Sequence, residues 1–400
     1  MSLLPLLSDP KVWKGFLEYK RSLAGNKAFS GELSSFVEEQ RYLAPAEKIL
    51  RGESFPLPKK SVISKLGSQK KRTVYIYPEP ENTVLKLLTY LILRRYDALF
   101  SGNLYSFRPG RTAKDAVRRL LRAPDIGKLY AYKADIHDYF NSIPVERFLP
   151  ELREALSDDP ELFAFLRGLL TEPRVLERGE TAAEYHKGIM AGTPLSAFYA
   201  NLYLRDLDSY FEREKILYCR YSDDVIVFSE TEQECRAHAG KIRDYLEARG
   251  LLMNPDKEFF SGPGEGFTFL GFSVSGGIVD IAPATVKKLK GKMRRKRDGL
   301  ARWCKRNGVE PKKAAAAFIR IFNRKLLESP EGNDLSWSRW FFSVINTADT
   351  LREIDRYAQD CIRYLLTGSH KKARFRVRYE ELKELGYRSL VHEYYEGPAE

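Results

Sequence analysis

Two adjacent carboxylates in the segment RYSDDVIVF are the first residues whose types and spacing indicate chemistry. Asp223 and Asp224 follow Tyr221 and Ser222, and mainly apolar residues flank the four, as expected for a strand, a tight turn and a second strand. Neighbouring carboxylates repel each other, so ionising both in a partly buried hairpin requires a compensating positive charge. A divalent metal ion supplies such a charge, and Mg²⁺ prefers carboxylate and phosphate oxygens.

The tetrapeptide YSDD is weak evidence by itself, because YxDD arises in roughly one in 20 random chains of this composition. An ordinary aspartate-rich hairpin turn is the alternative interpretation. A third acid from a separate strand would allow two metal ions to be held about 4 Å apart. ADIHDYFNSI offers Asp135 at the end of an apolar strand, whereas Asp138 follows the strand and is better placed to cap the next turn. We therefore expect Asp135, Asp223 and Asp224 to hold two Mg²⁺ ions, with Mn²⁺ as the alternative metal.

Strands and helices must bring these acids together. Residues 1–60 look mainly helical, and the pattern changes to alternating strands and helices after them. Periodicity and turn residues predict strands at 73–77, 129–136, 217–229 (two strands around a turn), 254–260 and 267–281, and helices at 84–99, 232–249, 286–303, 312–327 and 337–366. Such an alternation around a central hairpin is typical of an α+β sheet domain.

The positive charge of the chain is concentrated in one segment. The formal net charge is +13, but residues 283–327 contain sixteen Lys and Arg against two acids, a net +14 that leaves the rest near −1. A localised basic surface suits a phosphate backbone, because each contact releases condensed counterions. A solvated, solubilising face is the alternative. The acidic motifs upstream favour nucleic acid.

Composition limits the class of protein further. Hydrophobic residues make up 43% of the chain, as in a folded globular protein, and no run of about eighteen apolar residues indicates a membrane span. The four cysteines have no CxxC spacing, so a zinc site is not expected and reduced thiols of a cytoplasmic protein fit best. The start MSLLPLLSDPKVWKGF has no basic leader and no cleavage site, so we expect it to belong to the mature protein.

Five motifs in order resemble a known family. KADIHDYFNSIP, GTPLSAFYANLYL, RYSDDVIVF, NPDK and FTFLGF look like the successive palm motifs of prokaryotic reverse transcriptases, and SFRPGRTAKDAV is similar to the fingers motif of group II intron and other bacterial members. The resemblance covers residues 70–272. It implies a right-hand polymerase fold with α+β fingers and palm and an α-helical thumb, copying an RNA template into DNA from dNTPs. The implied domains are an N-terminal helical region (1–60), fingers and palm (61–281), a helical thumb (282–368) and a C-terminal tail (369–400).

The resemblance also assigns roles by position. Asp135, Asp223 and Asp224 match the metal-binding carboxylates. The other matched positions are Lys70 and Arg72, which grip the incoming triphosphate in the family; Arg108, near template or nucleotide; Gly192, in the loop that packs against nucleotide and template base; and Lys257, proposed to protonate pyrophosphate. Structural alternatives are a solvated basic run for the first two, an arginine bonded to loop carbonyls for the third, and a surface lysine for the last.

The chain departs from the family at one loop. The usual pattern QGxxxSP is replaced by AGTPLSA, with Ala191 and Ala197 at the altered positions, so contacts through that glutamine are not expected. This loop and the tail LGYRSLVHEYY look like the stand-alone class 2 defence-associated reverse transcriptases. That resemblance implies a companion noncoding RNA as template and an anti-phage role. An RNA-dependent RNA polymerase and a non-catalytic, maturase-type RNA-binding protein remain alternatives, and the oligomeric state stays open.

Phe140 carries a prediction about the sugar of the substrate. It follows Asp135 by five residues, where the family places an aromatic ring that crowds a ribose 2′-hydroxyl; a core aromatic beside Tyr139 is the alternative. Phe140→Ala should therefore increase incorporation of ribonucleotides relative to deoxynucleotides in primer extension. Unchanged sugar selectivity in this variant would contradict the assignment.

Overall fold

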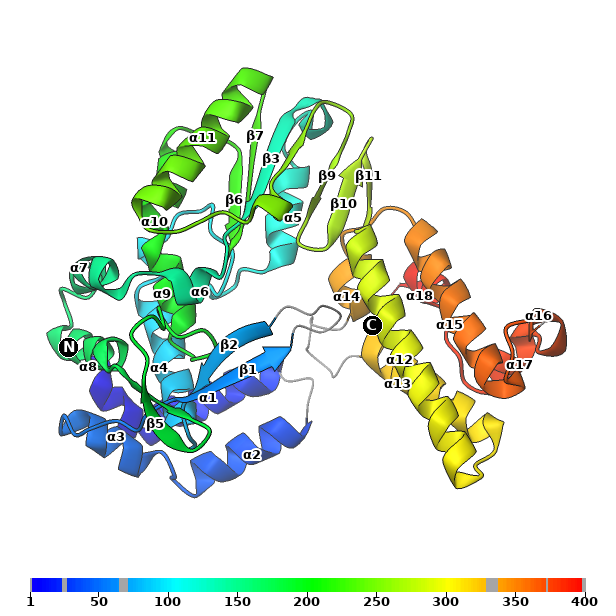
Figure 1. Ribbon diagram of the computed structural model, residues 1–400, viewed down its shortest axis with the longest axis horizontal. Helices are drawn as coiled ribbons and strands as arrows, with labels where there is room; N and C mark the ends of the chain where they lie inside the picture. The colour runs from blue at the N-terminus through cyan, green and yellow to red at the C-terminus, as the bar shows by residue number, and fades with distance from the viewer. Residues whose placement is uncertain (1, 24–26, 65–70, 329–336, 372, 398–400) are drawn as a thin grey trace. The chain divides into compact units, whose positions relative to one another are not determined.

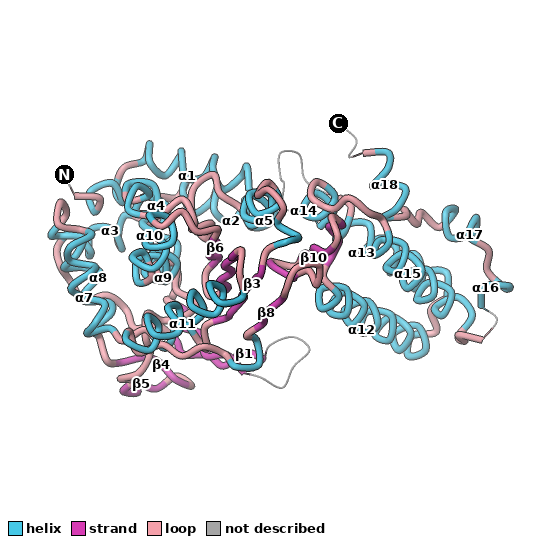
Figure 2. The backbone as a smooth tube through the Cα atoms, turned by 90° about the horizontal axis from the view of Figure 1, so that it is seen from above, coloured by secondary structure: helices cyan, strands magenta, loops and turns pink. Residues whose placement is uncertain are grey.

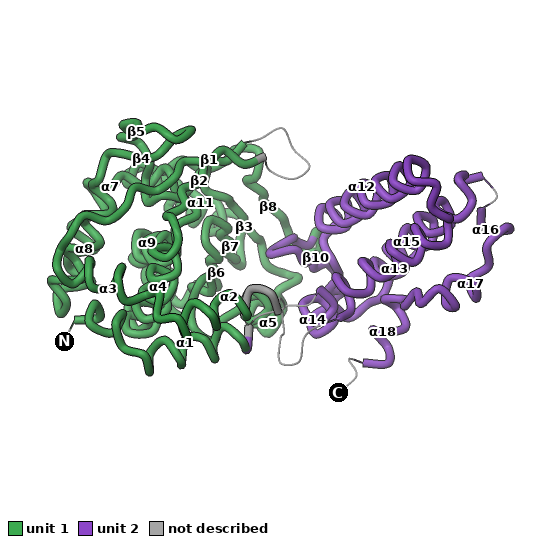
Figure 3. Tube along the Cα trace, turned by 90° about the horizontal axis from the view of Figure 1, so that it is seen from below, with its two compact units in different colours: residues 1–21, 26–265 green, residues 22–25, 266–400 purple. Residues whose placement is uncertain are grey.

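The computed structural model describes residues 2–23, 27–64, 71–328, 337–371 and 373–397 (Figure 1). The chain divides into two compact units, unit 1 with residues 1–21 and 26–265 and unit 2 with residues 22–25 and 266–400 (Figure 3). Both units combine helices with mainly antiparallel sheets, which confirms the predicted α+β class. Within the described ranges, no helix has both the length and the apolar character needed to cross a membrane.

A four-stranded antiparallel sheet lies at the centre of unit 1, in the order β6-β7-β3-β8. Its strands are β3 (Tyr130–Asp135), β6 (Tyr218–Tyr221), β7 (Asp224–Ser229) and β8 (Phe259–Ser261). Most residues of β3 and β7 are buried, and helix α11 (Glu232–Ala248) packs against both strands (Figure 2). Burial on this scale explains why β7 reads as an almost continuous apolar run.

A second sheet of unit 1 has the order β2-β1-β4-β5. It consists of β1 (Lys59–Ser64), β2 (Lys71–Ile76), β4 (Arg174–Glu177) and β5 (Glu180–Ala183). The β4–β5 hairpin was not expected from the sequence. Its signal is the pair Arg178 and Gly179, which turn the chain with φ angles of 54° and 93°. Two positive φ angles in a two-residue hairpin turn favour a glycine.

One apolar core runs through unit 1 from Leu3 to Leu251. At its N-terminal side the rings of Trp13 and Tyr42 stack 4.6 Å apart, and the Trp13 indole donates a hydrogen bond to the carbonyl of Leu7. The helices around this core are α1 (Pro10–Leu23), α2 (Lys27–Glu38), α3 (Leu43–Leu50), α4 (Glu81–Arg95), α5 (Ala113–Leu121), α6 (Tyr139–Ser142), α7 (Val145–Ala155), α8 (Pro160–Thr171), α9 (Ser196–Tyr203) and α10 (Arg205–Arg213), with short 3₁₀ turns η1 (Leu4–Ser8), η2 (Asp97–Leu99), η3 (Ile126–Lys128) and η4 (Pro255–Lys257).

Unit 2 begins with a three-stranded antiparallel sheet and continues as helices. Its strands are β9 (Phe267–Phe269), β10 (Phe272–Ser275) and β11 (Ile278–Ile281). Its helices are α12 (Pro283–Asn307), α13 (Pro311–Leu326), α14 (Trp337–Phe342), α15 (Asp349–Thr367), α16 (Ala373–Arg376), α17 (Tyr379–Glu384) and α18 (Leu390–Glu396). Helices α12, α13 and α15 pack against one another. Gly308 ends α12 in the left-handed conformation that favours glycine.

The helix expected at 337–366 is interrupted, so that prediction was wrong in its continuity. Helix α14 ends at Phe342 and α15 starts at Asp349. Between them, the Asn346 side chain accepts a hydrogen bond from Val279 N and donates one to Gly277 O, both at 2.8 Å. Because this side chain binds the backbone at the β10–β11 turn, the chain leaves the helical path there.

The C-terminal tail docks on α15 through one buried carboxylate. Asp355 is 4% exposed and accepts hydrogen bonds from the hydroxyls of Tyr387 and Ser389, at 2.7 and 2.6 Å. It also accepts from the backbone N–H groups of Leu390 and Val391. Four donors satisfy the carboxylate and hold the start of α18 against α15.

Candidate active site

The strand register of the central sheet brings three aspartates to one end of it. Asp135, the last residue of β3, lies directly opposite Asp224, the first residue of β7. Asp223 precedes it in the turn of the β6–β7 hairpin, where Ser222 has a φ of 60°. Asp135 is buried, and the other two aspartates are half-buried. Two separate strands therefore supply the acids that the sequence analysis singled out.

Burial and neighbouring charges raise the pKa of the two hairpin aspartates. Burial raises the pKa of Asp224 from its ordinary value of 3.8 to about 6; the charges of Asp223 and Asp135 add to the rise, and Lys133 opposes it. The pKa of Asp223 is also raised, by burial and by the charge of Asp135. Close like charges in a partly desolvated site disfavour ionisation, so a cation bound here would favour the charged forms of Asp223 and Asp224.

Two lysines lie beside the aspartates. Lys257 Nζ is 2.6 Å from Asp135 Oδ1, and Lys133 Nζ is 4.0 Å from Asp224 Oδ1. Among the described residues, no group of three or more His, Cys, Asp or Glu side chains is arranged as a metal site. The donor set nevertheless fits a hard divalent ion, because it consists of carboxylate oxygens held by two adjacent strands. Coordination by Asp135 Oδ1 requires Lys257 to move away from that oxygen.

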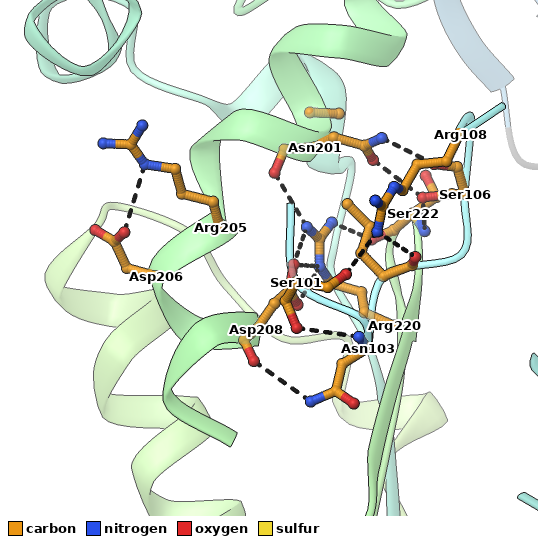
Figure 4. Close-up of polar contacts among 12 residues, drawn as sticks. Ser101, Asn103, Ser106, Arg108, Asn201, Arg205, Asp206, Asp208, Arg220 and Ser222 are labelled. Atoms are coloured by element: carbon orange, nitrogen blue, oxygen red, sulfur yellow. Dashed lines mark hydrogen bonds and ion pairs between the residues drawn. The ribbon is translucent and has the colours of Figure 1, made fainter. Parts of the chain in front are cut away.

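A buried ion pair holds the hairpin in place (Figure 4). Arg220 and Asp208 have fully buried side chains and share a bidentate contact, with Arg220 Nε 2.8 Å from Asp208 Oδ1 and Nη2 2.6 Å from Oδ2. Arg220 also donates to the carbonyls of Ser222 and Asn201. Burial raises the pKa of Asp208, and the guanidinium opposes that rise. The pair thus ties the turn before the two aspartates to helices α9 and α10.

A second set of hydrogen bonds supports the same turn. Ser222 N donates to Ser106 Oγ at 2.9 Å, and Ser106 Oγ donates to Asn201 Oδ1 at 3.0 Å. Asn201 Nδ2 returns a bond to Ser106 O (Figure 4). The supporting roles of Ser106, Asn201, Asp208 and Arg220 were not predicted from the sequence. The available signal was an arginine in an otherwise apolar strand, since such a charge is buried only with a partner.

The residues matched to the nucleotide lie around helix α6 and strand β2. Phe140 on α6 is half-buried, and its ring meets the exposed ring of Phe107 edge-on at 6.4 Å. Gly192 has a φ of 96°, and a Cβ there would lie 3.1 Å from Val74 Cβ and 3.2 Å from Tyr75 O. The loop containing Gly192 therefore packs on the backbone of β2, where a side chain at that position would be crowded and strained.

The predicted cationic residues differ in their surroundings. Arg72 lies exposed on β2, opposite Ile63 of β1. Lys70 is outside the described residues. Arg108 is buried: it makes a bidentate contact with the Asp97 carboxylate and donates to the carbonyl of Ser101. These contacts match the structural alternative, an arginine that satisfies loop groups.

Asp138 is the N-cap residue of α6, with a φ of 40°. Its carboxylate accepts from the Asn141 side chain at 3.3 Å. Asp138 was expected to cap the next turn; it occupies the N-cap position, but its side chain makes no capping hydrogen bond to the helix backbone.

Residues 57–274, more than half of the chain, match the family described as reverse transcriptase (RNA-dependent DNA polymerase). The chain belongs to this family. An uncharacterized 91 kDa protein in the cob intron of Schizosaccharomyces pombe is 26% identical over 171 residues, 42% of this chain and 20% of that protein. A putative enzymatic polyprotein of Cassava vein mosaic virus is 33% identical over 69 residues, 17% of this chain and 10% of the polyprotein. The chain thus spans a fifth or less of the length of these two relatives.

Solved structures similar to the chain include two telomerases. Apo telomerase from Candida Tropicalis, truncated from the C-terminal domain, has a TM-score of 0.46 and 13% identity, covering 56% of this chain and 55% of that one. Telomerase from Candida albicans in complex with a TWJ fragment of telomeric RNA has a TM-score of 0.45 and 12% identity, covering 92% and 71%.

Asp224→Asn should stabilise the metal-free protein at neutral to basic pH and have little effect in acid. The folded-state pKa is raised from 3.8 to about 6, so the bound proton stabilises the fold below the lower value, and that contribution is lost as the pH rises through the higher one. With a third of the side chain exposed, we expect a gain on the order of 1 kcal/mol at about pH 8. Thermal unfolding in a chelator measures it. A gain of equal size at about pH 4 would contradict this origin.

Proposed function

We propose that the protein is an RNA-templated DNA polymerase that adds dNTPs to a primer 3′-hydroxyl. The observation that carries this proposal is the register that sets Asp135 opposite Asp224 and beside the turn residue Asp223, in a chain of the reverse transcriptase family.

Asp135, Asp223 and Asp224 would hold two divalent ions, Mg²⁺ or Mn²⁺. When bound, such ions activate the attacking hydroxyl and neutralise charge on the triphosphate and the leaving pyrophosphate. The chain's own groups orient the reactants. We propose that Arg72 and Lys70 bind the triphosphate. Once Lys257 has moved away from Asp135, we propose that it donates a proton to pyrophosphate.

Phe140 and Gly192 shape the nucleotide side of the proposed site. A bulky ring at Phe140 disfavours a 2′-hydroxyl, so this residue supports DNA over RNA as the product. Primer extension with dNTPs and with rNTPs distinguishes the reverse transcriptase from an RNA-dependent RNA polymerase. Exclusive use of rNTPs would replace the proposal by that alternative.

Loss of one metal-binding carboxylate should abolish DNA synthesis. We expect Asp223→Asn to lower the rate of primer extension by roughly 10³-fold, because metal-bound charge stabilisation is worth several kcal/mol. Asp244→Asn, at an exposed aspartate of α11, is the matched control and should keep full activity. If Asp223→Asn left primer extension or biological activity intact, the maturase-type binding protein would be the better description.

Helix α12 supports a nucleic-acid partner. Nine of its basic side chains are exposed: Lys287, Lys288, Lys292, Arg294, Arg295, Lys296, Arg302, Lys305 and Arg306. A row of exposed cations on one long helix suits the regular spacing of backbone phosphates. We propose that α12 belongs to a thumb that binds the template–product duplex.

The finer assignment concerns the template and the biological role. The AGTPLSA loop and the tail LGYRSLVHEYY support a class 2 defence-associated enzyme that copies a companion noncoding RNA in anti-phage defence. We propose a cytoplasmic location, which the four free cysteines support.

The purified protein should carry one abundant RNA and its DNA copy, which sequencing of the co-purified nucleic acid would identify.

Combining Lys287→Gln, Lys288→Gln and Lys292→Gln should weaken binding of all sequences and flatten the slope of log affinity against log salt by up to roughly 3. Lys11→Gln with Lys14→Gln, two exposed lysines of α1, serves as control. A normal salt slope in the triple variant would remove α12 from the interface.

A further inference from the structure

The loop of residues 188–192 lacks the glutamine that is usual in this family. The side-chain amide of Asn141 binds the backbone of this loop instead. Asn141 Oδ1 accepts a hydrogen bond from Ala191 N at 3.1 Å. Asn141 Nδ2 donates to Thr73 O at 3.2 Å and to Asp138 Oδ1 at 3.3 Å. One half-buried side chain therefore connects the loop, strand β2 and the cap of helix α6.

The same three segments meet at two further backbone contacts. Tyr75 N donates to Ala191 O at 2.8 Å, and Ile189 N donates to Phe140 O at 2.9 Å. Gly188, with a φ of 54°, lies so close to α6 that a Cβ would be 2.4 Å from Phe140 O. The backbone of the loop is thus bound on one side to β2 and on the other to the helix that carries Phe140.

We infer that Asn141 is a positioning residue that sets the nucleotide pocket by locking the 188–192 loop between β2 and α6. The inference rests on the proposed polymerase function and adds to it the residue that holds the altered loop. It acts through backbone groups, since both amide functions of Asn141 are used by the chain itself. The side-chain carbonyl oxygen of Asn141 orients the peptide N–H of Ala191. Its amide nitrogen holds the backbone of β2 in position relative to Phe140.

Removal of this tether should weaken nucleotide binding more than catalysis. In Asn141→Ala, we expect KM for dNTPs to rise roughly ten-fold, with kcat changed by less than about three-fold, and the preference for dNTPs over rNTPs to fall. Asn141→Asp keeps the acceptor for Ala191 N but sets an oxygen against Thr73 O and Asp138, so its KM should rise at least as much.

A matched control exists in unit 2. Asn346 likewise binds backbone with one donated and one accepted hydrogen bond, to Gly277 O and from Val279 N of the β10–β11 turn. Asn346→Ala removes the same kind of tether and should leave KM for dNTPs unchanged. A rise in KM of the same size in both alanine variants would overturn the inference, because the effect would then not depend on the tether beside the nucleotide. A general loss of folded protein would instead lower the apparent kcat and leave KM unchanged.

Hydrogen exchange tests the tether without reference to activity. In Asn141→Ala, the amides of residues 189–192 and of β2 should exchange roughly ten-fold faster, whereas those of β3 and β7 stay protected. Unchanged exchange, or an unchanged KM, would overturn the inference. Absence of DNA synthesis by the unaltered protein would instead overturn the proposed function, and the exchange data would still decide whether Asn141 holds the loop.

Discussion

Repulsion among three carboxylates is the constraint on which the rest of unit 1 depends. Asp135, Asp223 and Asp224 occupy one end of a sheet, where burial and the neighbouring carboxylates raise the pKa of Asp223 and Asp224. A flexible hairpin would relieve the repulsion by separating them. The Arg220–Asp208 ion pair, whose charges are both fully buried, holds the hairpin in place and so prevents this separation.

That ion pair is better understood as a positioning device than as a source of stability. Desolvation of two charges offsets much of their attraction, so a buried pair contributes little net free energy compared with apolar packing. The pair fixes an orientation, because the planar guanidinium directs N–H donors of all three nitrogens at the Asp208 carboxylate and at the carbonyls of Ser222 and Asn201. A rigid turn follows, with its backbone groups satisfied.

Much of the α+β arrangement could be predicted from the sequence, because the motifs combine local patterns with turn residues. The 232–249 helix and the 217–229 hairpin are examples whose apolar periodicity and capping residues agree. Several contacts that escaped prediction join residues that are far apart in the sequence. Ser106 and Asn201 are 95 residues apart, and the contact of Lys257 with Asp135 spans more than a hundred. No local pattern encodes such pairs. The β4–β5 hairpin and the break at Asn346 were missed because short turns leave weak signals.

The close packing of Gly188 against the backbone of Phe140 limits which substitutions this part of the fold can accept. The main chain under Phe140 is held by Ile189 N–H and is approached so closely by Gly188 that no side chain fits there. The backbone at residue 140 is therefore fixed by its neighbours, whereas its half-buried ring is not part of these contacts. On the proposed function, a substitution of Phe140 changes the choice of sugar without displacing the backbone, whereas a side chain at residue 188 would clash with Phe140 O and disturb the fold.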